Sequence, residues 1–155
     1  MIKQLIVVAG QPNSGKTTAI RFAYGKLAEE GKSFDFNPRW DASELKLVLL
    51  IDGAKIGFAS SGDAPDRLER TLRFLFAQDC DVIVCAARLN RSGQRFHPTI
   101  DVVKRLADEH GLEVDWIDKR RSRNEQEWER DNLDVADKIV CRIRTAIGSG
   151  QLVEA

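Results

Sequence analysis

The sequence predicts an α/β fold: a three-layer sandwich in which a mostly parallel sheet of about five strands lies between helices on both faces. Three observations favour this class. Apolar runs of strand length alternate with segments of helical periodicity along most of the chain. Residues 81–87 (DVIVCAA) are almost continuously apolar, as is typical of a strand buried on both faces. Two further apolar runs flank an Asp-Gly pair at positions 52 and 53, which predicts one β-hairpin.

The first half of the chain is expected to contain a strand, a helix and the hairpin. Residues 2–9 are mostly apolar and predict the strand, and residues 16–31 predict a helix that is closed by a glycine. Residues 32–40 are expected to form a loop or a short extended segment. The runs 45–51 and 54–60 predict the two hairpin strands, joined by a type I′ turn, so that one strand runs against the others.

The second half continues the alternation, because apolar residues recur there at helical spacing between strand-like runs. We expect one domain over residues 1–147 and a flexible tail over residues 148–155. The expected order is helix, strand, loop, helix, strand and helix, over residues 65–77, 81–87, 88–97, 98–110, 112–117 and 124–147.

The composition is that of a globular protein, with 43% hydrophobic and 31% charged residues in a chain of 155. Lys plus Arg and Asp plus Glu both number 24, so net charge does not support a nucleic-acid partner. The 3 cysteines are too few and too scattered for a disulfide framework or a zinc site, and Cys85 is expected to be a small core residue. With no signal peptide and no run long enough to cross a bilayer, we expect a cytoplasmic protein with no membrane partner.

Residues 10–17 form a complete G-x-x-x-x-G-K-[ST] motif between an expected strand and an expected helix. Its glycines let the backbone wrap tightly and present N–H groups to phosphate oxygens, and the helix adds its positive end. Lys16 is expected to reach the β- and γ-phosphates, and the Thr17 hydroxyl to bind Mg²⁺. The residues expected to bind the nucleotide are Gly10, Gln11, Pro12, Asn13, Ser14, Gly15, Lys16, Thr17 and Thr18.

On this motif the chain resembles the P-loop NTPase superfamily, and the alternating pattern extends the likeness over most of the sequence. The resemblance implies a P-loop NTPase fold, with Mg²⁺ as cofactor and ATP or another nucleoside triphosphate as substrate. The hairpin is similar to the switch region of small GTPases. Residues 60–63 read Ser-Ser-Gly-Asp instead of D-x-x-G, and residues 116–119 read Trp-Ile-Asp-Lys instead of N-K-x-D. Guanine specificity and a regulatory GTPase are therefore not supported.

Three acids compete to complete the magnesium site. Asp52 ends an apolar run, but the turn explains it and directs its strand away from the nucleotide. Asp63 follows the returning hairpin strand on the ligand side, where it can contact Mg²⁺ or water or cap the next helix, with Ser60 and Ser61 as lesser candidates. Asp35 is either a general base or a solvated loop acid. We therefore assign the metal to Thr17 and Asp63.

Arginines gather in the loop after the strand at residues 81–87. Arg88, Arg91 and Arg95 could clamp a γ-phosphate or an acceptor, or simply be solvated, and Arg88 is the strongest catalytic candidate. The loop resembles the lid of small nucleotide kinases. A second basic run at residues 119–123 lies at the same expected edge. Of the tryptophans, Trp40 is a candidate to stack on a base, whereas Trp116 and Trp128 are expected in the core.

Three functions follow from these features. The first is Mg²⁺-dependent binding and hydrolysis of a nucleoside triphosphate, with Lys16, Asp63 and Arg88 in catalytic roles. The second is a small-molecule or nucleotide kinase, which needs a small-molecule acceptor for which the sequence shows no motif. The third is a non-catalytic nucleotide-binding module. A homo-oligomer in which a neighbouring copy supplies an arginine is compatible with each of them.

Overall fold

The computed structural model describes residues 2, 4–11, 14–36, 45–60, 64–119 and 121–154, and describes side chains as far as Gly148. The elements are β1 (Gln4–Gly10), α1 (Lys16–Ala28), β2 (Lys32–Asp35), β3 (Lys46–Ile51), β4 (Ala54–Ala59), α2 (Pro65–Ala77), β5 (Val82–Arg88), α3 (Pro98–Glu109), β6 (Val114–Lys119) and α4 (Glu125–Glu154).

The strands form one mixed sheet of six, in the order β2-β3-β4-β5-β1-β6. Strands β4, β5, β1 and β6 are parallel, and β3 is antiparallel to both of its neighbours. The expected α/β class and the single reversed hairpin strand are therefore confirmed. The sheet has one strand more than expected because residues 32–35 pair with β3 along their whole length.

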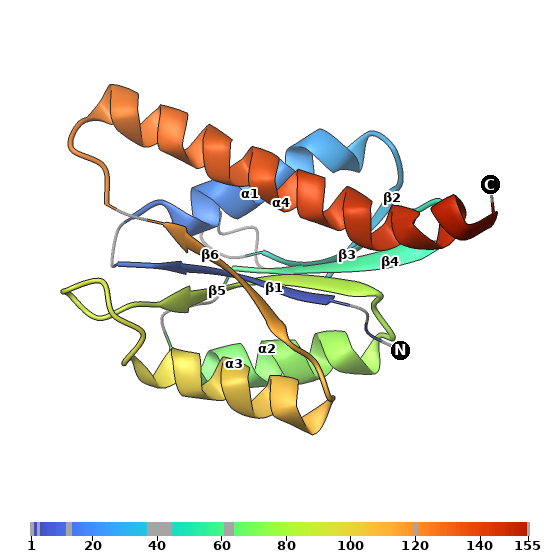
Figure 1. Ribbon diagram of the computed structural model, residues 1–155, viewed down its shortest axis with the longest axis horizontal. Coiled ribbons are helices and arrows are strands. Elements are labelled where there is room, and N and C mark those ends of the chain that lie inside the picture. Colours follow the sequence, from blue (N-terminus) through green and yellow to red (C-terminus); the bar gives the residue numbers. More distant parts are fainter. Residues whose placement is uncertain are drawn as a thin grey trace.

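Helices cover both faces of this sheet (Figure 1). Ile6 and Val8 of β1 pack with α1 and α4 in one hydrophobic cluster, whereas Leu5, Val7 and Ala9 pack with α2 and α3 in the other. This alternation follows from the period of two along a strand, and both sets are fully buried in β1. The central position of β1 places the segment that follows it in the middle of one sheet edge.

The turn between β3 and β4 has the geometry that the Asp-Gly pair predicts. Asp52 and Gly53 have φ angles of 49° and 82°, as a type I′ turn requires, and Ile51 pairs with Ala54 across it. Because β4 is parallel to β1, this turn lies at the edge opposite to the end of β1. The interpretation of Asp52 as a turn residue is confirmed.

The last helix is longer than expected. α2 and α3 match the predicted helices closely, but α4 continues to Glu154 instead of ending at Ile147. No proline follows Ile147, and a glycine such as Gly148 weakens a helix without stopping it. The sequence therefore lacks a strong stop signal at the place where we expected one.

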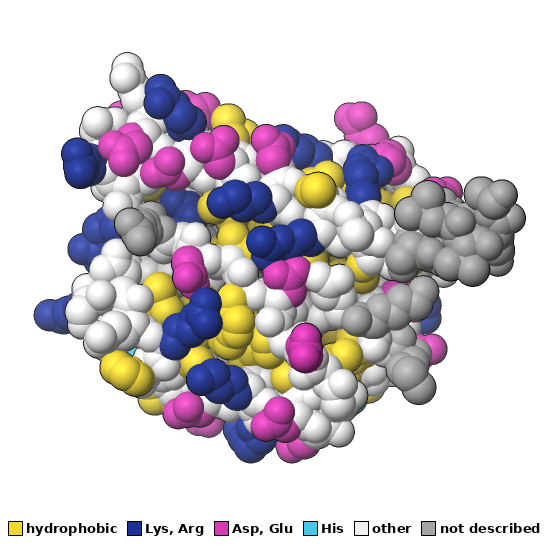
Figure 2. Space-filling view, viewed as in Figure 1, with side chains coloured by type: hydrophobic (Ala, Val, Ile, Leu, Met, Phe, Trp, Pro, Cys, Tyr) yellow, Lys and Arg dark blue, Asp and Glu magenta, His cyan; other side chains and the backbone are white. Residues whose placement is uncertain are grey.

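Side chains of both charge signs are interspersed over the face shown in Figure 2. Within the described ranges, no helix is both long enough and apolar enough to cross a membrane. Cys80 and Cys85 are buried, which confirms the core assignment of Cys85, and burial raises their thiol pKa values to about 11 and about 12.

Candidate functional site

The ends of several parallel strands bring the predicted site segments to one edge of the sheet. Gly10 at the end of β1 lies between Arg88 of β5 and Lys119 of β6. Ser60 follows β4 at the same edge, because β4 is parallel to β5. The juxtaposition of the glycine motif, the Ser60 segment and the arginine loop is thus as the rule for open parallel sheets predicts.

Both motif glycines occupy positions where a side chain does not fit. A Cβ atom on Gly10 would lie 2.4 Å from the Ser14 Oγ and 3.0 Å from the Lys119 carbonyl oxygen. Gly15 has a φ of 94°, and a Cβ there would lie 2.4 Å from the Asn132 Oδ1. The loop is therefore wrapped tightly and packed on both sides, which glycine alone permits.

Lys16 is held within the loop. Its side chain is 7% exposed, and its Nζ donates at 3.2 Å to the carbonyl oxygens of both Gly10 and Gln11. The helix that begins at Lys16 has no side-chain hydrogen bond from its N-cap, Gly15, and no acidic residue in its first turn. The positive end of α1 and the ammonium group thus lie together without a carboxylate on that turn.

A polar cavity of about 310 Å³ opens above this helix start, and we call it the phosphate cavity. The Ser60 Oγ accepts a hydrogen bond from the Leu45 backbone N–H at 2.6 Å, which fixes the serine at the cavity wall. Pro12, Asn13 and Asp63 lie outside the described residues, so their predicted roles stay predictions. The lining residues are Ser14, Gly15, Lys16, Thr17, Thr18, Ser60 and Trp128.

The arginine loop contacts the glycine motif through backbone groups. The Leu89 N–H donates to the Gly10 carbonyl oxygen at 2.9 Å, and the Gln11 Nε2 donates to the Arg91 carbonyl oxygen at 2.8 Å. The Arg95 guanidinium instead pairs with Asp118 at 3.1 Å and lies over the Trp116 ring. Arg95 is therefore engaged at the flank of β6.

Arg88 is half-buried at the end of β5, next to Gly10 in the sheet. Its backbone N–H donates to the Thr99 Oγ1 at 2.9 Å, which ties the strand end to α3. Asp35 is exposed at the end of β2, and β3, β4 and β5 separate that strand from β1. The structure thus brings Arg88 beside the motif and leaves Asp35 on a distant strand. Trp40 lies outside the described residues.

A buried polar side chain beside the motif was missed by sequence reasoning. Asn132 of α4 is fully buried against Gly15, and within the described part of the chain neither its Oδ1 nor its Nδ2 has a hydrogen-bond partner. The Ser14 Oγ is likewise buried and unpartnered there. Native proteins rarely leave such groups unsatisfied, so two of them at one loop indicate a place where a further polar group is accommodated.

Lys119 begins the basic run that could contact phosphate, a base or a polyanionic partner or simply be solvated, and it is 1% exposed, so it is not solvated. Burial lowers the pKa of its ammonium group, and the nearby Asp131 carboxylate opposes that shift. Asp131 also accepts a hydrogen bond from the Ser122 hydroxyl at 2.8 Å. The start of the segment after β6 is thus fixed against α4.

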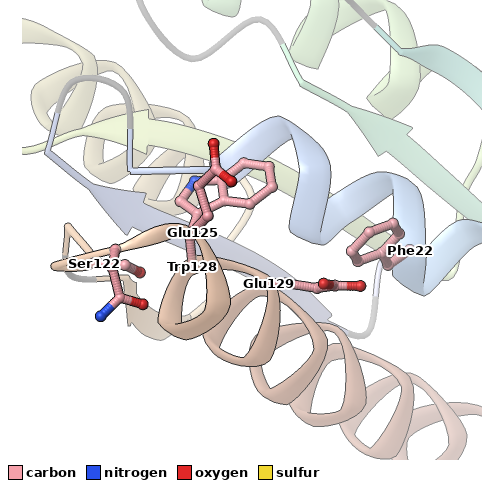
Figure 3. Close-up of a pocket in the computed structure, with 6 residues that line it drawn as sticks. Phe22, Ser122, Glu125, Trp128 and Glu129 are labelled. Carbon is pink, nitrogen blue, oxygen red and sulfur yellow. The ribbon is translucent and has the colours of Figure 1, made fainter.

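A second cavity, of about 690 Å³, lies between α1 and α4, and we call it the interhelix cavity (Figure 3). Trp128 lines both cavities and its side chain is 36% exposed, so the expectation that it is a core residue is wrong. The apolar stripe of α4 correctly predicted the side of the helix on which Trp128 lies, but it did not predict the cavity next to Trp128. The lining residues are Phe22, Ser122, Asn124, Glu125, Trp128 and Glu129.

Comparison with protein-family models and with curated proteins gives no match for this chain. Among solved structures, one titled "Crystal structure of APE1195" is similar at a TM-score of 0.40 and 15% identity, over 95% of this chain and 76% of that one. A likeness at this level carries no inference about fold family or activity.

Proposed function

We propose that this protein is a P-loop NTPase that binds a nucleoside triphosphate with Mg²⁺ at residues 10–18 and hydrolyses it, with ATP as the simplest substrate. One observation carries the proposal. The Lys16 ammonium group and the uncapped start of α1 meet at a polar cavity that continues from a tightly wrapped glycine loop.

This arrangement suits a polyphosphate. The first N–H groups of α1 have no acceptor from their cap residue, and the helix dipole adds roughly half a positive charge at the same point. Lys16 Nζ, now on two carbonyl oxygens, can exchange these for the more strongly accepting oxygens of a phosphate. A bound anion would therefore accept hydrogen bonds from the Lys16 Nζ and from the first N–H groups of α1.

The remaining groups fit hydrolysis at a γ-phosphate. Thr17 lines the cavity one residue after Lys16, where its hydroxyl would hold Mg²⁺. Bound Mg²⁺ supplies charge neutralisation at the β- and γ-phosphate oxygens. We assign Asp63 to the metal or to the attacking water, and Arg88 to the charge that develops on the transferred group. Lys16 would donate hydrogen bonds to the phosphate oxygens and hold them in place.

A small-molecule or nucleotide kinase is the second candidate, and the position of the arginine loop favours it. Residues 89–97 lie against the glycine motif, with a hydrogen bond from Gln11 to the backbone of Arg91. Arg91 itself is exposed, so its guanidinium is accessible to an acceptor that approaches over the phosphate cavity. The two functions differ only in whether water or a metabolite takes the phosphoryl group.

Phosphate release from ATP, with and without Mg²⁺ and with a panel of acceptors, tests these functions. Turnover without an acceptor supports hydrolysis, and turnover only with an acceptor supports a kinase. Tight binding without turnover would leave a non-catalytic module.

Lys16→Ala is expected to weaken ATP binding about 100-fold or more, since it removes a charged donor to the phosphates. Lys26→Ala is the matched control, because Lys26 lies on the same helix but pairs with Asp137. Unchanged ATP affinity in Lys16→Ala, measured by calorimetry, would overturn the proposal.

A further inference from the structure

The phosphate cavity and the interhelix cavity share one wall. Trp128, in the first turn of α4, lines both of them, so the two spaces adjoin at this residue. In Figure 3 the Trp128 indole projects from α4 toward α1, and the Glu129 side chain extends toward Phe22 on the facing helix. A ligand whose phosphates occupy the first space therefore has the second space next to it.

The two cavities have opposite electrostatic character. The phosphate cavity contains Lys16 and the positive end of α1. The interhelix cavity has two carboxylates in its wall, Glu125 and Glu129, and the first turn of α4 carries Glu127 as well. A second phosphate group would be repelled from the interhelix cavity, which argues against a phosphorylated acceptor there. The pair of spaces suits a molecule with a polyanionic end and a neutral end that donates hydrogen bonds.

We propose that the interhelix cavity binds the base of the nucleotide whose phosphates lie on residues 10–17, and that it favours bases with an exocyclic amino group. This inference rests on the function proposed above. Neither the glycine motif nor any comparison assigns a base site to this chain.

Aromatic groups stand on both sides of the cavity. The indole of Trp128 lies at the entrance from the phosphate side, and Phe22 lies farther along α1, six residues after Lys16 and about 9 Å along the helix axis. A flat base gains stacking energy against an indole face regardless of its sequence identity. The partial exposure of Trp128 leaves that ring surface available to a ligand.

The polar groups of the cavity are mainly acceptors. Glu125 and Glu129 are carboxylates. The Ser122 hydroxyl donates a hydrogen bond to Asp131, so only its lone pairs remain, and these can accept a hydrogen bond. The Asn124 Oδ1 is already used, because it accepts from the Glu127 backbone N–H at 2.9 Å. An amino group, as on adenine, guanine or cytosine, offers two protons to the Glu125 and Glu129 carboxylates, whereas the carbonyl oxygen that hypoxanthine carries in place of the adenine amino group cannot bond to them.

Calorimetry with ATP, ITP and inorganic tripolyphosphate tests the inference. ATP is expected to bind several-fold more tightly than ITP, because the inosine base lacks the amino group that would donate to the exposed Glu125 or Glu129 carboxylate. Trp128→Ala is expected to lower ATP affinity by about 5- to 100-fold, the range for loss of one base–aromatic stack. Phe22→Ala should also lower ATP affinity but leave tripolyphosphate affinity within about twofold, since Phe22 lines the interhelix cavity and not the phosphate cavity. Trp128→Phe should recover most of the ATP affinity and lose the fluorescence change that ATP causes.

Glu129→Gln should reduce the preference for ATP over ITP, while Asp134→Asn, an exposed acid of the same helix that does not line the cavity, should not. Equal affinities for ATP and ITP, or an equal loss of tripolyphosphate and ATP binding in Phe22→Ala, would overturn the base site and leave the proposed function intact. If wild-type protein binds neither tripolyphosphate nor ATP, the proposed function itself fails.

Discussion

Helices α1 and α3 begin at the same edge of the sheet, yet their first turns are finished in different ways. α3 begins with Pro98, and the side chain of its N-cap, His97, accepts from the Thr99 backbone N–H at 3.2 Å. Asp101 also places a carboxylate in its first turn. α1 begins after Gly15 with no capping side chain and no acid. Among the described residues, the start of α3 thus has a capping side chain and an acid, and the start of α1 has neither.

This difference distinguishes a helix start that stabilises the fold, at α3, from one that is suited to bind a ligand, at α1. A capping side chain stabilises a helix by about 1 kcal/mol, and an acid in the first turn adds several tenths more. α1 lacks both contributions at the point where the sequence carries a phosphate-binding motif. The Ser14 Oγ and the Asn132 amide, buried and without a hydrogen-bond partner among the described residues, add to the deficit on the same side of the loop. A bound anion would offset these costs at α1, whereas α3 needs none.

The largest expected effect comes from a methyl group on the α1 start. Gly15→Ala introduces a residue at a φ of 94° and a Cβ atom 2.4 Å from the Asn132 Oδ1. Left-handed backbone costs an alanine about 1–2 kcal/mol, and displacement of the loop should reduce ATP affinity about 100-fold. Gly53→Ala, at a φ of 82° with open space around it, should show a similar backbone cost and unchanged binding. If calorimetry shows equal ATP binding in Gly15→Ala and Gly53→Ala, Gly15 matters only for the backbone conformation and not for binding.

A smaller effect is expected from the acids that were weighed for the metal. Asp63→Asn should lower Mg²⁺-dependent turnover at least about tenfold, because a carboxylate ligand or water acceptor is lost. Asp52→Asn should leave turnover unchanged, because Asp52 lies in a turn at the opposite edge of the sheet. Steady-state rates across a Mg²⁺ titration measure both. If Asp52→Asn lowers turnover more than Asp63→Asn does, the acid that completes the Mg²⁺ site lies at the Asp52 end of the hairpin.

Asn132→Leu should stabilise the free protein and weaken the complex. Leucine has the same branched shape and number of side-chain heavy atoms, and it removes two buried polar atoms that have no partner among the described residues, so we expect the free energy of unfolding to rise by about 1 kcal/mol. We expect the Asn132 amide to pair with the loop when phosphate binds, so tripolyphosphate affinity should fall several-fold in Asn132→Leu. Chemical denaturation and calorimetry give the two numbers. A variant that is less stable and binds normally would make Asn132 a structural residue only.

Sequence periodicity predicted the parts of this fold that depend on local order. The helix at residues 65–77, the buried strand β5 and the Asp52 turn all lie where their patterns indicate. Each depends on neighbours close in the chain, such as alternating apolar residues or a pair of residues suited to positive φ. The edge strand β2 was less certain because its four residues are exposed and are ordered only by pairing with β3.

The missed site residues depend on contacts distant in sequence. Asn132 and Lys119 are polar, and polar residues in a helix or after a strand normally indicate solvent. Their burial follows from the packing of α4 against α1 and β6, which no local pattern encodes. Trp128 was placed on the correct helix face, but the cavity beside it is lined together with Phe22 of α1, which is distant in sequence. The motif could thus be identified from sequence, and its surroundings could not.

The smallest expected effect is at the other helix start. His97→Ala removes the side-chain acceptor for the Thr99 N–H and should reduce the free energy of unfolding by about 1 kcal/mol, as for other lost caps. ATP affinity and turnover should be unchanged, because the first turn of α3 already has its own proline and acid and needs no ligand. Thermal melting and calorimetry on the same sample decide the matter. A loss of ATP binding that exceeds the loss of stability would mean that α3 also contributes to the site, through Thr99 and its hydrogen bonds to the backbone of Arg88.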